Sequence, residues 1–138
     1  MNFFQSFAIS GSGMTAERLR LDLISNNIAN LNTTRSPEGG PYRREVPVFV
    51  RHLERAKRGF QGGGVRVAAV VKDPSPPRIV HEPGHPDADA AGYVAYPNVD
   101  LNREFIDMIG ARRAYEANAA ALEAAKQMVS RALELGRG

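Results

Sequence analysis

The chain has 138 residues, enough for one domain or for a stem that carries one small domain. It contains no cysteine, which excludes disulfide bonds, a thiolate nucleophile and a zinc–cysteine cluster. Its net charge of +3 comes entirely from the middle of the chain, because residues 1–31 carry two acids and two bases, and residues 98–138 carry six of each. Because the two ends carry no net charge, we expect contact between helices to dominate there.

The basic side chains of the middle segment are predicted to form a solvated surface. No aromatic residues alternate with them, as a single-stranded nucleic-acid site would require, so we expect no nucleic-acid partner. The basic residues are Arg43, Arg44, Arg51, Arg55, Lys57 and Arg58.

Two features of the sequence concern membranes and export. No apolar run approaches the roughly 18 residues that cross a bilayer, so we expect no direct membrane insertion. The N-terminus has no basic segment followed by an uninterrupted apolar stretch, and its first basic residue is Arg18. We therefore expect no cleaved secretory signal peptide.

The first predicted element is a helix over residues 3–31. Its apolar side chains recur every seven residues with additional ones on adjoining positions, a narrow stripe that is typical of a coiled-coil seam. Gly11 and Gly13 each weaken the helix by about 1 kcal/mol relative to alanine, so we expect a bend or fraying there, with Ser12 or Thr15 capping a restarted helix. The stripe consists of Phe3, Phe7, Met14, Leu21, Ile24, Ile28 and Leu31.

The middle of the chain is rich in proline and glycine, and all nine prolines lie between Pro37 and Pro97. Alternating apolar residues predict strands over residues 42–50 and 65–71, and the intervening residues 51–64 are expected to be a flexible connection. Ile79 and Val80 are expected in a short edge strand, because prolines flank them, and residues 93–96 in another extended piece.

The last predicted element is a helix from Leu101 to about Leu135, with Asp100 or Asn98 as its N-cap. Such a helix would be roughly 52 Å long, too long for the core of a small globule, so its apolar stripe must contact the first helix and neighbouring molecules. The stripe consists of Phe105, Met108, Tyr115, Ala119, Leu122, Val129 and Leu133.

These elements predict an α+β fold in which two long terminal helices form a coiled-coil-like stem, with a small β-rich insert between them. We expect the N-terminal helical segment of the stem in residues 1–34, the insert in residues 35–97, and the C-terminal long helix in residues 98–138.

One cluster of residues has the composition of a metal site. Two histidines and three carboxylates occur within nine residues, but no helical H-E-x-x-H motif joins them. A rigid loop in which the aspartates form Asx turns is the preferred interpretation, so we expect no catalytic, cofactor-binding or metal-binding residues, no cofactor and no small-molecule substrate. The cluster is His81, Glu82, His85, Asp87 and Asp89.

Three stretches of the chain carry a family resemblance. Residues 21–34 contain a motif around Ser25, Asn27, Ile28, Ala29, Asn30 and Thr33. Residues 73–100 include the sequence PGHPDADAAGYVAYPN, and the last helix contains Arg113, Tyr115 and Asn118 in an R-x-Y-x-x-N element. Together they resemble the bacterial flagellar basal-body rod proteins, and the central stretch resembles those of the proximal rod.

This resemblance implies a structural protein rather than an enzyme. It implies export through the flagellar type III apparatus without a cleaved signal, followed by helical stacking with other rod proteins and with copies of itself. The product would be a hollow drive shaft that crosses the periplasm and transmits torque for cell motility. The terminal helices would form its inner tube, and the insert would face outward.

We predict that assembly contacts lie along the two seams. Tyr115 and Asn118 are expected to set the register between helices, and the N-terminal asparagines to pair across subunits. In the isolated subunit we expect mobile termini outside roughly residues 40–96. The predicted interface residues are Phe7, Met14, Leu21, Ile24, Asn27, Ile28, Asn30, Leu31, Phe105, Met108, Tyr115, Asn118, Leu122, Val129 and Leu133.

Two alternatives remain open on the sequence alone. A coiled-coil adaptor whose basic insert binds an acidic partner would form a small oligomer of defined size. A metal-dependent hydrolase would depend on His81 and His85.

Overall fold

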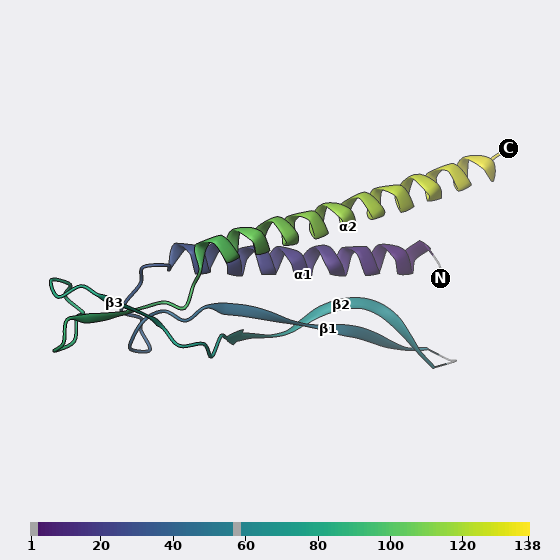
Figure 1. Cartoon of the computed structure of the whole chain (residues 1–138). Coiled ribbons are helices and arrows are strands. Elements are labelled where there is room, and N and C mark those ends of the chain that lie inside the picture. Colours follow the sequence, from purple (N-terminus) through teal and green to yellow (C-terminus); the bar gives the residue numbers. More distant parts are fainter. Residues whose placement is uncertain (1–2, 57–58) are drawn as a thin grey trace.

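A computed structural model describes residues 3–56 and 59–138, and for residues 53–56 and 59–61 it describes the backbone alone. Two long helices at the ends of the chain enclose a β-rich insert, so the predicted α+β fold with two long terminal helices is confirmed. Figure 1 shows α1 lying between α2 and a long hairpin, with the two chain termini at the same end of the molecule.

Helix α1 runs without interruption from Phe3 to Ala29. The bend expected near Gly11 and Gly13 is absent, and Ser12 does not cap a second helix. Its hydroxyl instead donates to the Ile9 carbonyl oxygen at 2.7 Å and accepts from the Val65 amide of the hairpin at 3.1 Å. Gly13 is buried against Asn118 of α2, so packing on both sides of α1 offsets the low helix propensity of its glycines.

Helix α2 runs from Leu101 to Leu135, as the sequence predicts. Asp100 is its N-cap, because its side chain accepts a hydrogen bond from the Arg103 amide at 2.9 Å. The other candidate cap, Asn98, contacts the base of the hairpin. The two helices diverge gradually toward the chain termini, and the last turns of α2 extend beyond the end of α1 (Figure 1).

The hairpin consists of β1, Glu45–Ala56, and β2, Gly59–Lys72, paired antiparallel with Val46 opposite Val71. Both strands are longer than predicted: residues 51–56 and 59–64, expected as a flexible connection, belong to the ladder, and residues 57–58 lie outside the described residues. Two register shifts bend the ribbon. Contact with α1 supports the hairpin, which would be marginal alone.

A second, smaller sheet lies beyond the C-terminal end of α1 (Figure 1). Strand β3, Arg78–His81, pairs antiparallel with β4, Tyr93–Tyr96, which confirms the predicted short edge strand and the extended piece. The loop between them is a turn-rich one, in which the Asp89 carboxylate accepts from the Ala91 and Tyr93 amides, both at 2.9 Å.

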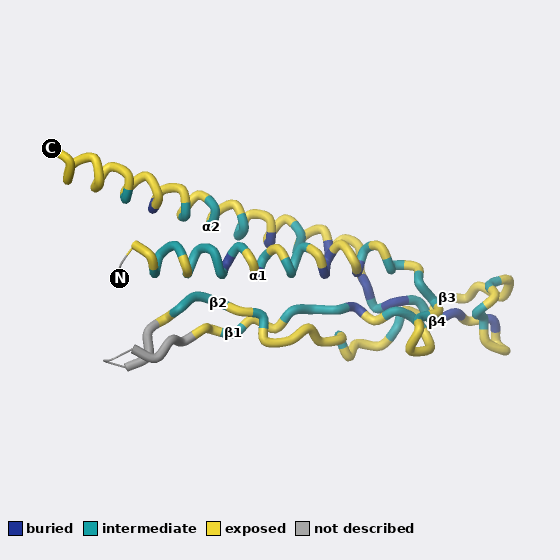
Figure 2. The backbone as a smooth tube through the Cα atoms, turned by 180° about the vertical axis from the view of Figure 1, so that it is seen from behind, coloured by how far each residue is buried: buried dark blue, intermediate teal, exposed yellow. Residues whose placement is uncertain are grey.

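The apolar core is small for a chain of this size. Its buried apolar side chains lie mostly where α1 meets α2 and the hairpin, and they are Ala16, Leu23, Ile24, Val94, Val99, Ala111 and Ala125. Figure 2 shows separate buried positions along the two helices and others near the small sheet, with exposed positions over most of α2. The chain exposes 9705 Å², whereas a compact monomer of 15.0 kDa would expose about 7,000 Å². Within the described residues, no helix combines the length and the apolar character that a membrane span requires.

Candidate assembly surfaces

The inner face of α2 is a continuous seam against α1. Its buried and half-buried residues recur at alternating intervals of four and three, the spacing of a heptad seam. One row holds Met108, Tyr115, Leu122 and Val129, which the sequence predicts. The members of the alternate row are small or polar, so the apolar periodicity does not reveal them, and only Asn118 is predicted, from the R-x-Y-x-x-N element. The row is Glu104, Ala111, Asn118 and Ala125.

Small residues bring the two helices close together. A Cβ atom placed on Gly13 would lie 2.7 Å from Nδ2 of Asn118, and Ala16 of α1 is only 3% exposed. The Asn118 amide donates to the Ala114 carbonyl oxygen of its own helix at 3.0 Å, which fixes the side chain against the glycine. The seven-residue spacing of Ala111, Asn118 and Ala125 is the sequence signal that could have identified this contact.

The structure divides the predicted interface residues into three groups. Ile24 and Asn27 are buried inside the chain, at 4% and 1% exposure. Phe105 and Leu133 are exposed, at 48% and 66%. The remainder are half-buried, mostly in the region between α1 and α2: Phe7, Met14, Leu21, Ile28, Asn30, Leu31, Met108, Tyr115, Asn118, Leu122 and Val129.

Asn27 satisfies its hydrogen bonds within the chain. Its side-chain oxygen accepts from the Glu45 amide and the Tyr42 hydroxyl, both at 2.9 Å, and its nitrogen donates to the Glu45 carbonyl oxygen at 2.9 Å. Asn30 likewise donates to the Asn26 carbonyl oxygen at 2.9 Å. Asn27 therefore supports the joint between α1 and β1 in this structure.

Helix α2 carries about half of the large apolar side chains that are exposed in the described part of the chain. The first two turns expose Leu101, Phe105, Ile106 and Ile109, with Ile106 at 69%. Further along, Met128, Leu133 and Leu135 are exposed at 56%, 66% and 84%. By contrast, the exposed residues of α1 from Thr15 to Ala29 are mostly polar or charged. They are Thr15, Arg18, Asp22, Ser25, Asn26 and Ala29. This stretch of α1 therefore presents a more polar surface to solvent than α2 does, whereas the first turn of α1 exposes Phe3 and Phe4 at 47% and 81%.

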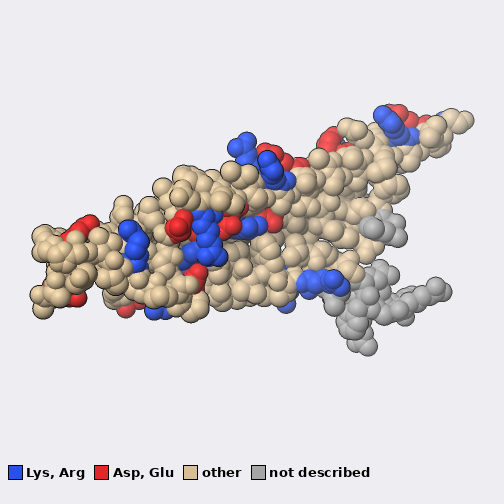
Figure 3. All heavy atoms as spheres, in the orientation of Figure 1, with Lys and Arg blue, Asp and Glu red and all other residues tan. Residues whose placement is uncertain are grey.

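Charged side chains on the outer surface of α2 pair within the helix. Arg112 and Glu116 are 3.0 Å apart, and Lys126 and Glu123 are 3.9 Å apart. Such exposed pairs contribute little to stability. Figure 3 shows isolated charges along α2 and a denser gathering of both signs near its beginning. On the face that Figure 3 shows, stretches of α2 without charged side chains separate these charges, so a second helix would meet little repulsion there.

Arg44 corrects the expectation that the basic residues of the insert form a solvated surface. It is 7% exposed and pairs with Glu104, which is fully buried in the first turn of α2. Its pKa is raised despite burial, because the Glu104 carboxylate accepts a hydrogen bond from it. Neighbouring Arg43 is exposed, as predicted.

The histidine and carboxylate cluster of the 81–89 loop is held by contacts of its own. His81 and His85 pack edge-on against Tyr93 and Tyr96. The Thr34 hydroxyl and Arg35 both bond the Asp87 carboxylate and hold its pKa below the ordinary value. In the part of the chain that the structure describes, no group of three or more His, Asp and Glu side chains could hold a metal ion.

Comparison with known proteins identifies the family. Residues 7–35 match the family described as flagella basal body rod protein, and residues 90–135 match the flagellar basal body rod FlgEFG protein C-terminal family. The flagellar basal-body rod protein FlgC of Borreliella burgdorferi is 44% identical, with both chains covered completely. The FlgC proteins of Yersinia enterocolitica and Bacillus subtilis are 41% and 38% identical, each aligned over 99% of this chain and 100% of its own. The chain belongs to the FlgC family of flagellar basal-body rod proteins.

Proposed function

We propose that the chain is a structural subunit of the proximal rod of the flagellar basal body, and that it polymerises helically through its terminal helices. The observation that carries the proposal is the exposed surface, which exceeds that of a compact monomer by roughly 2,700 Å². Much of the exposed apolar surface lies on α2, where another helix can cover it. Obligate assemblies bury about 2,000–5,000 Å² in total, so neighbouring subunits can account for the excess.

The inner seam and the outer face of α2 have different roles in this proposal. The inner seam joins α1 to α2 within one subunit and leaves its half-buried members for neighbours to cover. The outer face, with Phe105, Ile106 and Ile109, contacts the next subunit. Because the two surfaces differ, the contact is head-to-tail, and a head-to-tail contact whose rotation does not close into a ring builds a helical filament.

The proposal extends to the organisation and the route of the protein. Residues 1–34 and 98–138 form the stem of the subunit, and residues 35–97 form an insert on its outside. The chain leaves the cell through the flagellar type III apparatus without a cleaved signal, and joins copies of itself and other rod proteins in the periplasm. It transmits torque and catalyses no reaction.

Complementation of a strain that lacks its own copy of this chain tests the proposal. The variant Ile106→Glu/Ile109→Glu places two charges in the proposed contact, and we expect rods and swimming to be lost while the isolated variant unfolds at the same temperature as the parent. The variant Ala68→Glu/Ala69→Glu on β2 adds the same charge at two exposed positions outside the proposed contact, so it is the matched control and should swim. Normal swimming of the Ile106→Glu/Ile109→Glu strain would overturn the proposed contact.

Light scattering separates this function from the coiled-coil adaptor. An adaptor forms a small oligomer of one size at all concentrations. A rod subunit is a monomer at low concentration and forms assemblies of increasing size as its concentration rises, since each subunit added to a helical filament leaves its end open for the next.

A further inference from the structure

Every connection between the stem, the hairpin and the β3–β4 sheet passes through one place in the molecule. The chain leaves α1 and enters β1 there, leaves β2 toward β3 through residues 73–77, and returns to α2 through residues 97–100. The Asp73 amide donates to the Arg44 carbonyl oxygen at 2.8 Å, which closes the open end of the hairpin at this point. We call this place the junction.

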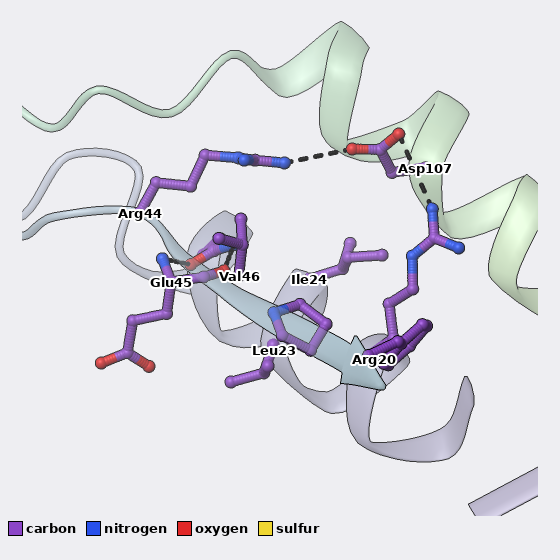
Figure 4. Close-up of a pocket in the computed structure, with 10 residues that line it drawn as sticks. Arg20, Leu23, Ile24, Arg44, Glu45, Val46 and Asp107 are labelled. Atoms are coloured by element: carbon purple, nitrogen blue, oxygen red, sulfur yellow. Dashed lines mark hydrogen bonds and ion pairs between the residues drawn. The ribbon is translucent and has the colours of Figure 1, made fainter. Parts of the chain in front are cut away.

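Arg44 joins the hairpin to α2 at the junction. Its guanidinium contacts three carboxylates: that of Glu104 in a close ion pair, that of Asp107 at 3.1 Å and that of Asp73 at 3.5 Å. The side chains of Arg44 and Glu104 are 8% and 0% exposed, so water does not compete for these bonds. Figure 4 shows Arg44 extended toward Asp107 of α2, with Arg20 of α1 approaching the same carboxylate from the other side.

Two asparagines tie the remaining segments to the same cluster. Asn27 of α1 lies within 3.4 Å of the Glu104 carboxylate and bonds both backbone groups of Glu45, the first residue of β1. Asn98 accepts from the Arg44 amide at 2.8 Å and donates to the carbonyl oxygens of Asp73 and Ser75 at 3.1 Å. Directional hydrogen bonds therefore hold α1, the start of β1, the connection 73–77 and the start of α2 together at the junction.

Neither the long helices nor the hairpin contacts the β3–β4 sheet directly. Among the described elements, β3 and β4 contact only each other, and the tie from Asp87 to Thr34 and Arg35 reaches a loop rather than a helix. The hairpin, in contrast, also packs along α1. The small sheet is thus joined to the stem through the junction and through the loop of Thr34 and Arg35, without direct contact with a helix or with the hairpin.

A buried ion pair is a poor source of stability, because removing two charges from water costs about as much as their attraction returns. Its geometry, however, is restrictive, since a planar guanidinium bonds carboxylates only in fixed directions. Apolar side chains of similar volume would fill the same space without such directions. A cluster of this kind is suited to setting an orientation.

We propose that Arg44 and Glu104 are positioning residues that hold the insert at one fixed orientation on the helical stem, so that the subunit carries load as a single rigid piece. This inference rests on the proposed function for its role in the rod. Its structural part, the fixed orientation, stands on the isolated chain and is tested there.

Spin labels on the isolated full chain measure that orientation. The chain has no cysteine, so labels attach only where one is introduced. Ala90→Cys with Ala120→Cys reports the small sheet against α2, and Ala69→Cys with Ala120→Cys reports the hairpin; all three positions are exposed. Ala8→Cys with Ala120→Cys reports the two helices and is the internal control.

The variant Arg44→Met/Glu104→Leu removes the ion pair and retains side-chain volume. We expect the 90–120 distance distribution to broaden at least twofold, the 69–120 distribution to broaden less, and the 8–120 distribution to stay unchanged. Arg43 is the exposed neighbour of Arg44, so Arg43→Met is the matched control. It should leave all three distance distributions as they are in the parent. Unchanged 90–120 widths in the double variant would overturn the proposal.

A second variant keeps the test decisive if the double variant fails to fold. Arg44→Lys retains the positive charge but replaces the planar fork with a single ammonium, so we expect it to broaden the 90–120 distribution with helix content preserved. A 90–120 width equal to that of the parent in a folded Arg44→Lys variant would also overturn the proposal.

The rod assay separates the inference from the proposed function. If the parent chain fails to restore rods in a strain that lacks its own copy, the proposed function is wrong, whatever the label distances show. If the parent restores rods and the double variant shows unchanged distances, only the positioning role is wrong.

Discussion

At the scale of single residues, Gly13 decides how closely the two helices approach. We predict that Gly13→Ala lowers the free energy of unfolding by about 1–3 kcal/mol, because the added methyl group overlaps the Asn118 side chain and the cost exceeds the gain in helix propensity. Urea denaturation followed by circular dichroism measures the change.

Two further substitutions make the Gly13 prediction specific. Gly11 lies on the same helix with no atom near its missing Cβ, so Gly11→Ala should stabilise the chain by up to about 1 kcal/mol. Asn118→Ala should recover most of the loss in the Gly13→Ala background. Equal stabilisation by both glycine substitutions would show that the helices are not in close contact at Gly13.

Tyr42 gives the chain an alkaline pH dependence. Burial and the nearby Glu45 carboxylate raise the pKa of its hydroxyl from 10.0 to about 12. A pKa that is higher in the folded chain stabilises the fold fully below pH 10, and this contribution is lost as the pH rises through about 12. We predict that the free energy of unfolding falls more steeply over this range in the parent than in Tyr42→Phe, as measured by urea denaturation at several pH values. Parallel curves would contradict the raised pKa.

At the scale of elements, the sequence predicts the bounds of α2 well but underestimates the lengths of the two hairpin strands. Heptad spacing and the Asp100 cap are local signals, and they predict α2 from Leu101 to Leu135. The extension of the hairpin across residues 51–64 depends on α1 lying beside it, which local sequence does not reveal. The buried Arg44–Glu104 pair joins residues 60 positions apart, so composition alone assigns both to the surface.

Gly64 determines how the hairpin rests on α1. Its φ of +104° is strained for other residues, and a Cβ atom there would overlap the Ser12 hydroxyl. We predict that Gly64→Ala destabilises the chain by at least about 2 kcal/mol. It should also speed hydrogen exchange of the Val65 amide, which donates a hydrogen bond to the Ser12 hydroxyl. Gly62→Ala, in open space on the same strand, is the control. Slow exchange of the Val65 amide in Gly64→Ala would show that other contacts hold the hairpin against α1.

At the scale of the whole molecule, the packing of α1 on two sides and of α2 on one side predicts unequal mobility in the isolated chain. The sequence alone suggests that both termini are mobile, whereas the structure places α1 between α2 and the hairpin and leaves nearly all of residues 126–135 exposed. We predict fast amide exchange in residues 126–135 and slow exchange in residues 13–27, because exchange follows local burial.

Assembly should slow amide exchange at the end of α2 and leave exchange in α1 unchanged. Neighbouring subunits that cover the outer face of α2 would slow exchange in residues 126–135 and leave residues 13–27 as slow as before, since α1 is already packed within the subunit. Hydrogen exchange with mass spectrometry on the monomer and on assembled rods measures both segments. Equally fast exchange of the two helices in the monomer would show that α1 is not held by α2 and the hairpin, and that the helical stem forms only in the rod.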